Sequence, residues 1–136
     1  MEAIEFIRRR FGFAPDWLAG LELLKEQGAI FVGTRAVMEF NLVKPMRRGL
    51  RLCRVFPHSV KPTTFAMQLL WRGAKTGVVQ VSEQQAKDLI NGSEIEIDAP
   101  VDNGFVLIVW QNFVVGVGFY KKPLLKSHIP RVRPVD

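Results

Sequence analysis

The sequence predicts an α+β fold in which a mixed helix-and-strand module precedes a second, smaller module built mostly of strands. Three observations support this prediction. Residues 105–120 form two apolar runs separated by Gln111 and Asn112, a pattern typical of a β-hairpin. Residues 82–90 begin with a helix-capping pattern. Several short apolar runs that end at Gly or Pro indicate further strands.

The composition limits the class of protein. The chain has 136 residues, a formal net charge of +6 and 48% apolar residues, which fits one domain or two small ones. No apolar run reaches the roughly 18 residues of a membrane helix, and the acidic N-terminus is unlike a signal peptide. Cys53 is the single cysteine, which excludes an internal disulfide. We therefore expect a cytoplasmic protein without a membrane partner.

The first residues favour a helix. Residues 2–10 place Ile4 and Ile7 on one face, and Gly12 is a suitable position for the helix to end. Pro15 indicates that a short second helical turn begins there.

Strands are expected next. Residues 21–33 predict a hairpin that turns at Gly28, and Thr34 can cap a short helix after it. Residues 49–56 then predict a strand closed by a proline. Cys53 lies inside this strand and is interpreted as a small packed residue rather than a nucleophile.

A capped helix is predicted to complete the first module. Thr63 or Thr64 is expected at its N-cap, and the helix should end near Arg72. We place the domain boundary there, with an N-terminal domain of residues 1–72 and a C-terminal domain of residues 73–136. The predicted apolar face of the helix comprises Phe65, Met67, Leu69 and Leu70.

The second module should begin with a short strand and a helix. Ser82 and Gln85 have the spacing of a capping box. The apolar run before the hairpin turn lacks alternation, as in a strand buried on both faces, and Asn112 is expected to adopt positive φ in the turn. The expected elements are a strand at 77–81, a helix at 82–90, a strand at 94–98 and the hairpin.

Two glycines on the second hairpin strand suggest that something approaches it closely. The period of two places Val115, Val117 and Phe119 on one face, and Gly116 and Gly118 on the other. The glycine face would then be bare backbone. Either a ligand or another part of the protein could lie against it, and both interpretations stay open.

Charge is segregated along the chain. Residues 40–82 contain eight cations and no acid, whereas residues 83–102 contain six acids and a single lysine. Basic side chains return after residue 120. Counterion release would draw a polyanion such as nucleic acid to the basic segments, although an ordinary solvated basic face is the alternative interpretation.

Four motifs in the second half are Gly77-Val-Val-Gln-Val, Leu89-Ile-Asn-Gly-Ser, Asn103-Gly-Phe-Val-Leu-Ile-Val and Val115-Gly-Val-Gly. With them this half resembles the PUA domain, an RNA-binding module. The resemblance implies a PUA-like mixed β pseudo-barrel after the N-terminal mixed α/β module. The turn Gln111-Asn112-Phe113 departs from the usual glycine-containing turn of the family.

Three more motifs extend the resemblance to residues 20–133. They are Arg47-Arg-Gly-Leu-Arg-Leu-Cys-Arg-Val, Lys61-Pro-Thr-Thr-Phe-Ala-Met-Gln-Leu and Leu125-Lys-Ser-His-Ile-Pro-Arg. With them the chain resembles the C-terminal RNA-binding region of ribosomal RNA cytosine-5 methyltransferases and its small stand-alone archaeal relatives.

No residues indicate a reaction. The chain has no glycine-rich strand-to-helix loop for S-adenosylmethionine, and Cys53 matches none of the cysteine nucleophile motifs of those methyltransferases. His58 and His128 are too far apart in sequence to suggest a zinc site or a Cys-His pair. We expect no enzyme activity, no cofactor and no bound metal.

We therefore predict binding of structured RNA, ribosomal or transfer RNA, in RNA modification or ribosome biogenesis. The alternative is a protein-interaction module that docks onto an RNA-modifying methyltransferase or a ribosome-assembly factor through apolar side chains of residues 1–24. A third hypothesis, an RNA-processing enzyme, would need an acidic cleft.

The two basic segments are expected to form one continuous surface. The predicted RNA-binding residues are Arg47, Arg48, Arg51, Arg54, Lys61, Gly116, Gly118, Lys121, Lys122, Lys126, His128, Arg131 and Arg133.

Overall fold

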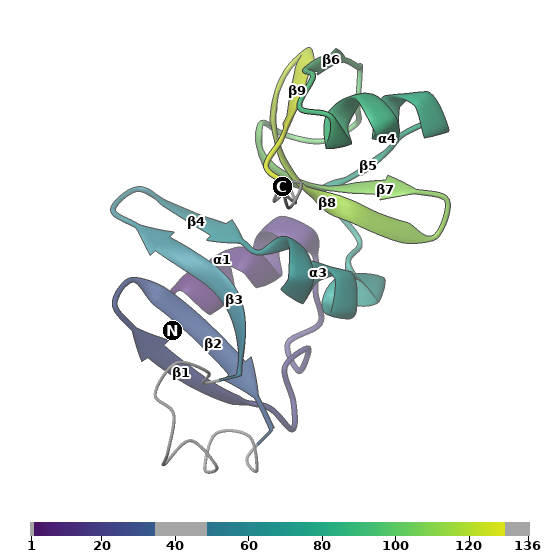
Figure 1. Ribbon diagram of the computed structural model, residues 1–136. Helices are drawn as coiled ribbons and strands as arrows, with labels where there is room; N and C mark the ends of the chain where they lie inside the picture. The colour runs from purple at the N-terminus through teal and green to yellow at the C-terminus, as the bar shows by residue number, and fades with distance from the viewer. Residues whose placement is uncertain (1, 35–48, 130–136) are drawn as a thin grey trace, which may run out of the picture.

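Two β-sheets with helices between them make up the protein (Figure 1). The computed structural model describes residues 2–34 and 49–129. The four-stranded sheet comes from the first half of the chain, and the curled five-stranded sheet comes from the second half. This arrangement confirms the predicted α+β fold. Within the described ranges, no helix is long and apolar enough to cross a membrane.

Helix α1 (Glu2–Phe11) forms as the sequence predicts. Its first turn carries acids and its last turn carries arginines, which complements the helix dipole. Ile7 and Phe11 are fully or almost fully buried. Gly12 ends the helix with φ +67°, a conformation that glycine adopts without steric cost.

The first sheet is an antiparallel meander in the order β1-β2-β3-β4. Gln27 and Gly28 both have positive φ in the β1–β2 turn, so the predicted hairpin is confirmed. The last strand, β4, was not predicted from the sequence. The helix expected after Thr34 lies outside the described residues. The strands are β1 (Glu22–Glu26), β2 (Ala29–Gly33), β3 (Leu50–Phe56) and β4 (Ser59–Pro62).

Helix α3 (Thr64–Leu70) starts at the expected N-cap, where the Thr63 hydroxyl accepts from the backbone N–H of Ala66, and a 3₁₀ turn (Trp71–Gly73) follows it. The predicted apolar face was right for Met67 and for Leu70, which packs against the core, and wrong for Phe65 and Leu69. Ala66 and Met67 are buried, whereas Phe65 is 61% exposed and Leu69 is 74% exposed. Residues four apart lie on one face of a helix, so these two side chains point together away from the core.

The second sheet has the order β5-β7-β8-β9-β6, with β5 parallel to β7 and the other pairs antiparallel. Helix α4 (Glu83–Ile90) begins with the predicted capping box, in which both reciprocal hydrogen bonds between Ser82 and Gln85 are present. The strands are β5 (Val78–Gln80), β6 (Ile95–Glu96), β7 (Gly104–Trp110), β8 (Phe113–Lys121) and β9 (Leu124–Ser127).

The β7–β8 hairpin differs from its prediction in two details. Gln111 has the positive φ, at 54°, and not Asn112. The register shifts next to Ile108, which pairs with Gly116, while Val109 pairs with Val114. Val115 is therefore the extra residue of a bulge, and it packs in a different core cluster from Val117.

The glycine face of β8 is covered by the protein's own chain, which is one of the two interpretations that the sequence left open. A Cβ added at Gly116 would lie 2.1 Å from Cγ1 of Ile129. A Cβ added at Gly118 would lie 2.8 Å from Cδ1 of Ile108 and from the backbone oxygen of Lys126. These contacts leave no room for a ligand, and they favour the interpretation in which the protein's own chain approaches the glycines.

One hydrophobic core joins the two halves of the chain. It contains Ile7 of α1, Leu52 of β3 and Met67 of α3, together with Leu107 and Val117 of the second sheet. This core crosses the domain boundary expected after residue 72. A second core lies between α4 and the other face of the five-stranded sheet. The two modules therefore pack as one body around α1 and α3.

Candidate nucleic-acid interface

A basic groove is lined by residues of the β3–β4 hairpin, the first turn of α3 and the segment after β9. Its volume is about 520 Å³. None of its lining residues is an acid. We call this site the basic groove, and its lining residues are Phe31, Gly49, Leu50, Arg51, Arg54, Phe56, Lys61, Pro62, Thr63, Thr64, Phe65 and His128.

A bulge in β3 brings the two arginines of this strand together. Residues three apart on a regular strand point to opposite faces. In β3, however, Ile30 pairs with Cys53 and Phe31 pairs with Arg51, so Leu52 is an extra residue. Arg51 and Arg54 therefore lie on the same face of the sheet and line the same groove.

The cations of the groove oppose one another without a neutralising acid. Arg54 and Lys61 are direct cross-strand partners, an arrangement of like charges that destabilises a strand pair. Partial burial, and to a smaller extent Arg54, lower the pKa of Lys61. In the described ranges, neither side chain forms an ion pair with a carboxylate. An anion bound between them would relieve this repulsion.

Aromatic side chains form the walls of the groove. Phe56 at the end of β3 is 46% exposed, and Phe65 in α3 is 61% exposed, although both are large apolar residues. The guanidinium carbon of Arg51 lies 5.6 Å from the ring centroid of Phe31, a cation–π contact. Exposed rings and cations therefore line the same groove.

His128 closes the groove from the second module. Its backbone N–H donates to Val117 O at 2.8 Å, and its ring meets Phe105 edge-on, with centroids 5.7 Å apart. Partial burial is the main cause that lowers the pKa of His128, and the nearby charges of Lys61 and Lys126 lower it further. His128 therefore lies close to the cations of both modules.

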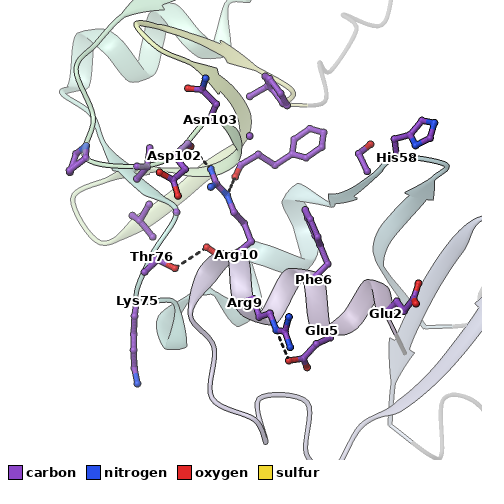
Figure 2. A pocket seen from close by; sticks show the side chains of 18 residues that line it. Glu2, Glu5, Phe6, Arg9, Arg10, His58, Lys75, Thr76, Asp102 and Asn103 are labelled. Atoms are coloured by element: carbon purple, nitrogen blue, oxygen red, sulfur yellow. Dashed lines mark hydrogen bonds and ion pairs between the residues drawn. The ribbon is translucent and has the colours of Figure 1, made fainter.

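A larger cavity of about 1320 Å³ lies between α1 and the second sheet (Figure 2). We call it the mixed-charge cavity because acids such as Glu5 and Asp102 line it together with Arg9, Arg10 and Lys75. Glu5 and Arg9 form an ion pair there, with Nε and Oε1 3.2 Å apart. Figure 2 shows the Arg10 side chain reaching across the cavity, where it donates to the backbone oxygens of residues 105 and 102 at 2.8 and 2.7 Å.

The predicted RNA-binding residues separate into groups. Arg51, Arg54, Lys61 and His128 meet in the basic groove. Lys126 is exposed next to it, where it acts on the pKa of His128. Lys121 and Lys122 lie at the other end of β9, and Lys122 Nζ is 3.1 Å from Oδ1 of Asp98. Gly116 and Gly118 are buried beneath other side chains. The remaining predicted residues, Arg47, Arg48, Arg131 and Arg133, lie outside the described residues.

The sequence analysis missed the aromatic part of the groove. Phe65 was predicted to be in the core because it is apolar and follows a helix cap, and no role was assigned to Phe31 or Phe56. A signal was nevertheless present. Phe56 and Phe65 enclose the short segment that carries Lys61, so exposed rings next to cations were a plausible arrangement.

A comparison with protein families places the second half of the chain in a known class, that of PUA domains. Residues 76–133 match the family described as "Methyltransferase RsmF PUA domain". The protein is therefore a PUA-domain protein whose C-terminal part resembles that domain of RsmF, as the sequence motifs indicate. The match covers a little less than half of the chain. No curated protein matches it.

Proposed function

We propose that this protein binds structured RNA, ribosomal or transfer RNA, without acting on it chemically, and that it serves RNA modification or ribosome biogenesis. The observation that carries the proposal is the basic groove, in which Arg51, Arg54 and Lys61 converge without an acid among the lining residues, with His128 of the second module at their side. The match to a methyltransferase-associated PUA domain supports the same class of ligand. The single buried cysteine fits a reducing compartment such as the cytoplasm.

The groove has the two components that RNA recognition requires. Arg54 and Lys61 provide positive charge at a fixed cross-strand distance, which suits neighbouring phosphates. The exposed rings provide surfaces on which bases can stack. Because the groove is lined by both the first sheet and the segment after β9, bound RNA would contact both modules at once.

The alternative function, docking onto an RNA-modifying enzyme or an assembly factor, receives less support. It relied on an exposed apolar surface in residues 1–24. Ile7, Phe11 and Phe13 of this segment are buried in the shared core, and among its large apolar side chains Phe6 and Leu23 are the exposed ones. The remaining apolar surface is small.

A titration of RNA binding across salt concentrations tests the proposal. A stem-loop RNA should bind with a logarithmic affinity that falls linearly with the logarithm of salt concentration, with a slope of about −0.7 to −0.9 for each phosphate contacted. The double substitution Arg54→Gln and Lys61→Gln should weaken binding and make the slope shallower by about two. Binding without a salt slope would contradict the proposal.

A matched control removes the same net charge elsewhere. Arg72 and Lys87 are exposed and do not line the basic groove. The double variant Arg72→Gln and Lys87→Gln should therefore keep most of the affinity. Equal losses in both double variants would mean that the net charge of the protein, and not the groove, attracts RNA.

A further inference from the structure

The dimensions of the basic groove limit what can enter it. Its volume of about 520 Å³ falls within the roughly 300–1,000 Å³ of pockets that hold drug-sized molecules. Such a space suits a few nucleotides. A continuous RNA duplex keeps its bases stacked inside the helix and presents mainly backbone and a shallow minor groove.

The positions of the phenylalanines match unpaired bases better than a duplex. Phe56 comes from the end of a strand and Phe65 from the first turn of a helix, yet both line the same groove and both are about half exposed or more. Exposed rings contribute nothing to phosphate binding. Bases that are splayed out of a helix, in contrast, stack on aromatic side chains.

Arg51 adds a planar cation to the groove. Its guanidinium carbon lies over the Phe31 ring, 5.6 Å from the ring centroid. A guanidinium group can also stack on an unpaired base. Arg54 and Lys61 are cross-strand neighbours in the same groove and can hold the phosphates that connect stacked bases.

We infer that the basic groove binds an unpaired stretch of nucleotides, with bases stacked on Phe56 and Phe65 and phosphates held by Arg54 and Lys61. This inference rests on the proposed function and narrows its ligand to RNA with an exposed loop, bulge or single-stranded end. The groove would then bind unpaired nucleotides in preference to a duplex. The PUA domain contributes His128 at the edge of the groove.

The test compares two RNAs and three proteins. One RNA is a stem closed by a pyrimidine-rich loop, and the other is the same stem extended through the loop as a continuous duplex. The proteins are the unmodified chain, the double variant Phe56→Leu and Phe65→Leu, and the control Phe113→Leu. Phe113 is 64% exposed at the tip of the β7–β8 hairpin and lines neither the basic groove nor the mixed-charge cavity.

The unmodified protein should bind the stem-loop at least tenfold more tightly than the duplex. The groove variant should lose roughly five- to 150-fold of its stem-loop affinity, the equivalent of one stacked base or more, and little of its duplex affinity. The Phe113→Leu protein should bind as the unmodified protein does. Thermal melts should be similar for all three proteins, because the replaced rings are exposed and leucine retains an apolar side chain.

The outcomes separate this inference from the proposed function. Equal affinity for the two RNAs, or unchanged stem-loop binding by the groove variant, would overturn the inference while RNA binding stands. Binding of neither RNA would overturn both. A loss in the groove variant accompanied by a lowered melting temperature would call for Phe65→Tyr, which keeps a stacking ring and should restore the affinity if the inference is right.

Discussion

The basic groove and the mixed-charge cavity differ in the contacts that their charged residues make, and their volumes do not reflect this difference. The cavity is more than twice as large, at about 1320 Å³ against about 520 Å³. Three of its charged lining residues, Glu5, Arg9 and Arg10, nevertheless have partners within the described part of the protein. Arg8 and Arg9 pair with Glu5 on α1, and hydrogen bonding to Arg8 is the main cause that lowers the pKa of Glu5 to about 2. Arg10 is committed to backbone oxygens.

In the groove, no carboxylate of the described residues forms an ion pair with a lining cation, and two rings are exposed. Arg54 and Lys61 face one another without an acid among the lining residues, and Phe56 and Phe65 remain exposed beside them. The comparison teaches that, in the described part of the chain, the groove gathers cations without a carboxylate partner beside exposed rings, whereas Glu5, Arg9 and Arg10 of the larger cavity already have partners within the protein. Substitutions in the cavity should therefore affect stability, and those in the groove should affect binding.

The largest expected effect concerns Arg10 in the mixed-charge cavity. Arg10→Ala removes two hydrogen bonds from a charged donor to the backbone of the second module and should destabilise the protein by roughly 1.5–3 kcal/mol or more. RNA affinity at a temperature where the variant is folded should change little. Chemical denaturation and RNA titration of the same sample measure both quantities.

Arg9→Ala is the control for this prediction. Arg9 is a neighbour on the same helix, but it is exposed and makes a surface ion pair with Glu5 at 3.2 Å. Removing it should cost less than about 1 kcal/mol. Equal destabilisation by the two substitutions would show that the bonds of Arg10 do not hold the modules together.

Gly116 lies under Ile129, which follows the groove residue His128, and its substitution should have the second largest effect. Gly116→Leu places a side chain where Ile129 packs, and overpacking of this kind should cost about 1–3 kcal/mol. Ile129 follows His128 directly, so displacing it would also disturb the edge of the groove. A melting temperature that stays unchanged while RNA binding is lost would restore the earlier interpretation of this glycine as a ligand contact.

Local pattern in the sequence predicted most of the fold. Helix α1, the β1–β2 hairpin and the capping box of α4 depend on residues close in sequence, and all three are confirmed. Strand β4 was missed because it has only four residues and both its ends, Ser59 and Pro62, are residue types common in turns. The exposed face of α3 was misassigned because apolar spacing does not say which side of a helix meets the core.

The candidate site was less predictable because it depends on register. The basic segment indicated Arg51, Arg54 and Lys61, but regular alternation would separate the two arginines onto opposite faces. The bulge at Leu52, which joins them, is visible only in the pairing of β3 with β2. In the same way, the cover over Gly116 comes from Ile129, which is remote in sequence.

The third expected effect concerns Arg51 and is smaller, because this residue is one of several cations in the groove. Arg51→Gln should lower RNA affinity about fivefold, or about 1 kcal/mol, without changing stability. Arg51→Lys keeps the charge but loses the planar group that stacks on Phe31. Full retention of affinity in the lysine variant would show that Arg51 acts only through its charge. Arg72→Gln, outside the groove, is the control.

The smallest expected effect is a pH dependence centred on His128. Partial burial and the charges of Lys61 and Lys126 lower its pKa below 6.5, so the unfolded chain binds this proton more readily than the folded protein does. The contribution of His128 to the stability of the free protein is therefore present above about pH 6.5 and is lost as the pH falls through the lowered folded pKa.

Bound RNA would oppose the effect of the two lysines on the pKa of His128. A phosphate in the groove would screen His128 from the two lysines and favour its protonated form, so RNA affinity should rise as the pH falls through this range, by roughly two- to fivefold for one partly exposed charge. His128→Gln should remove the rise while leaving the affinity at pH 8 nearly unchanged, and His58→Gln, an exposed histidine outside the groove, should retain it. If the rise persists in His128→Gln, another group titrates, and the segment after β9 does not reach the bound RNA.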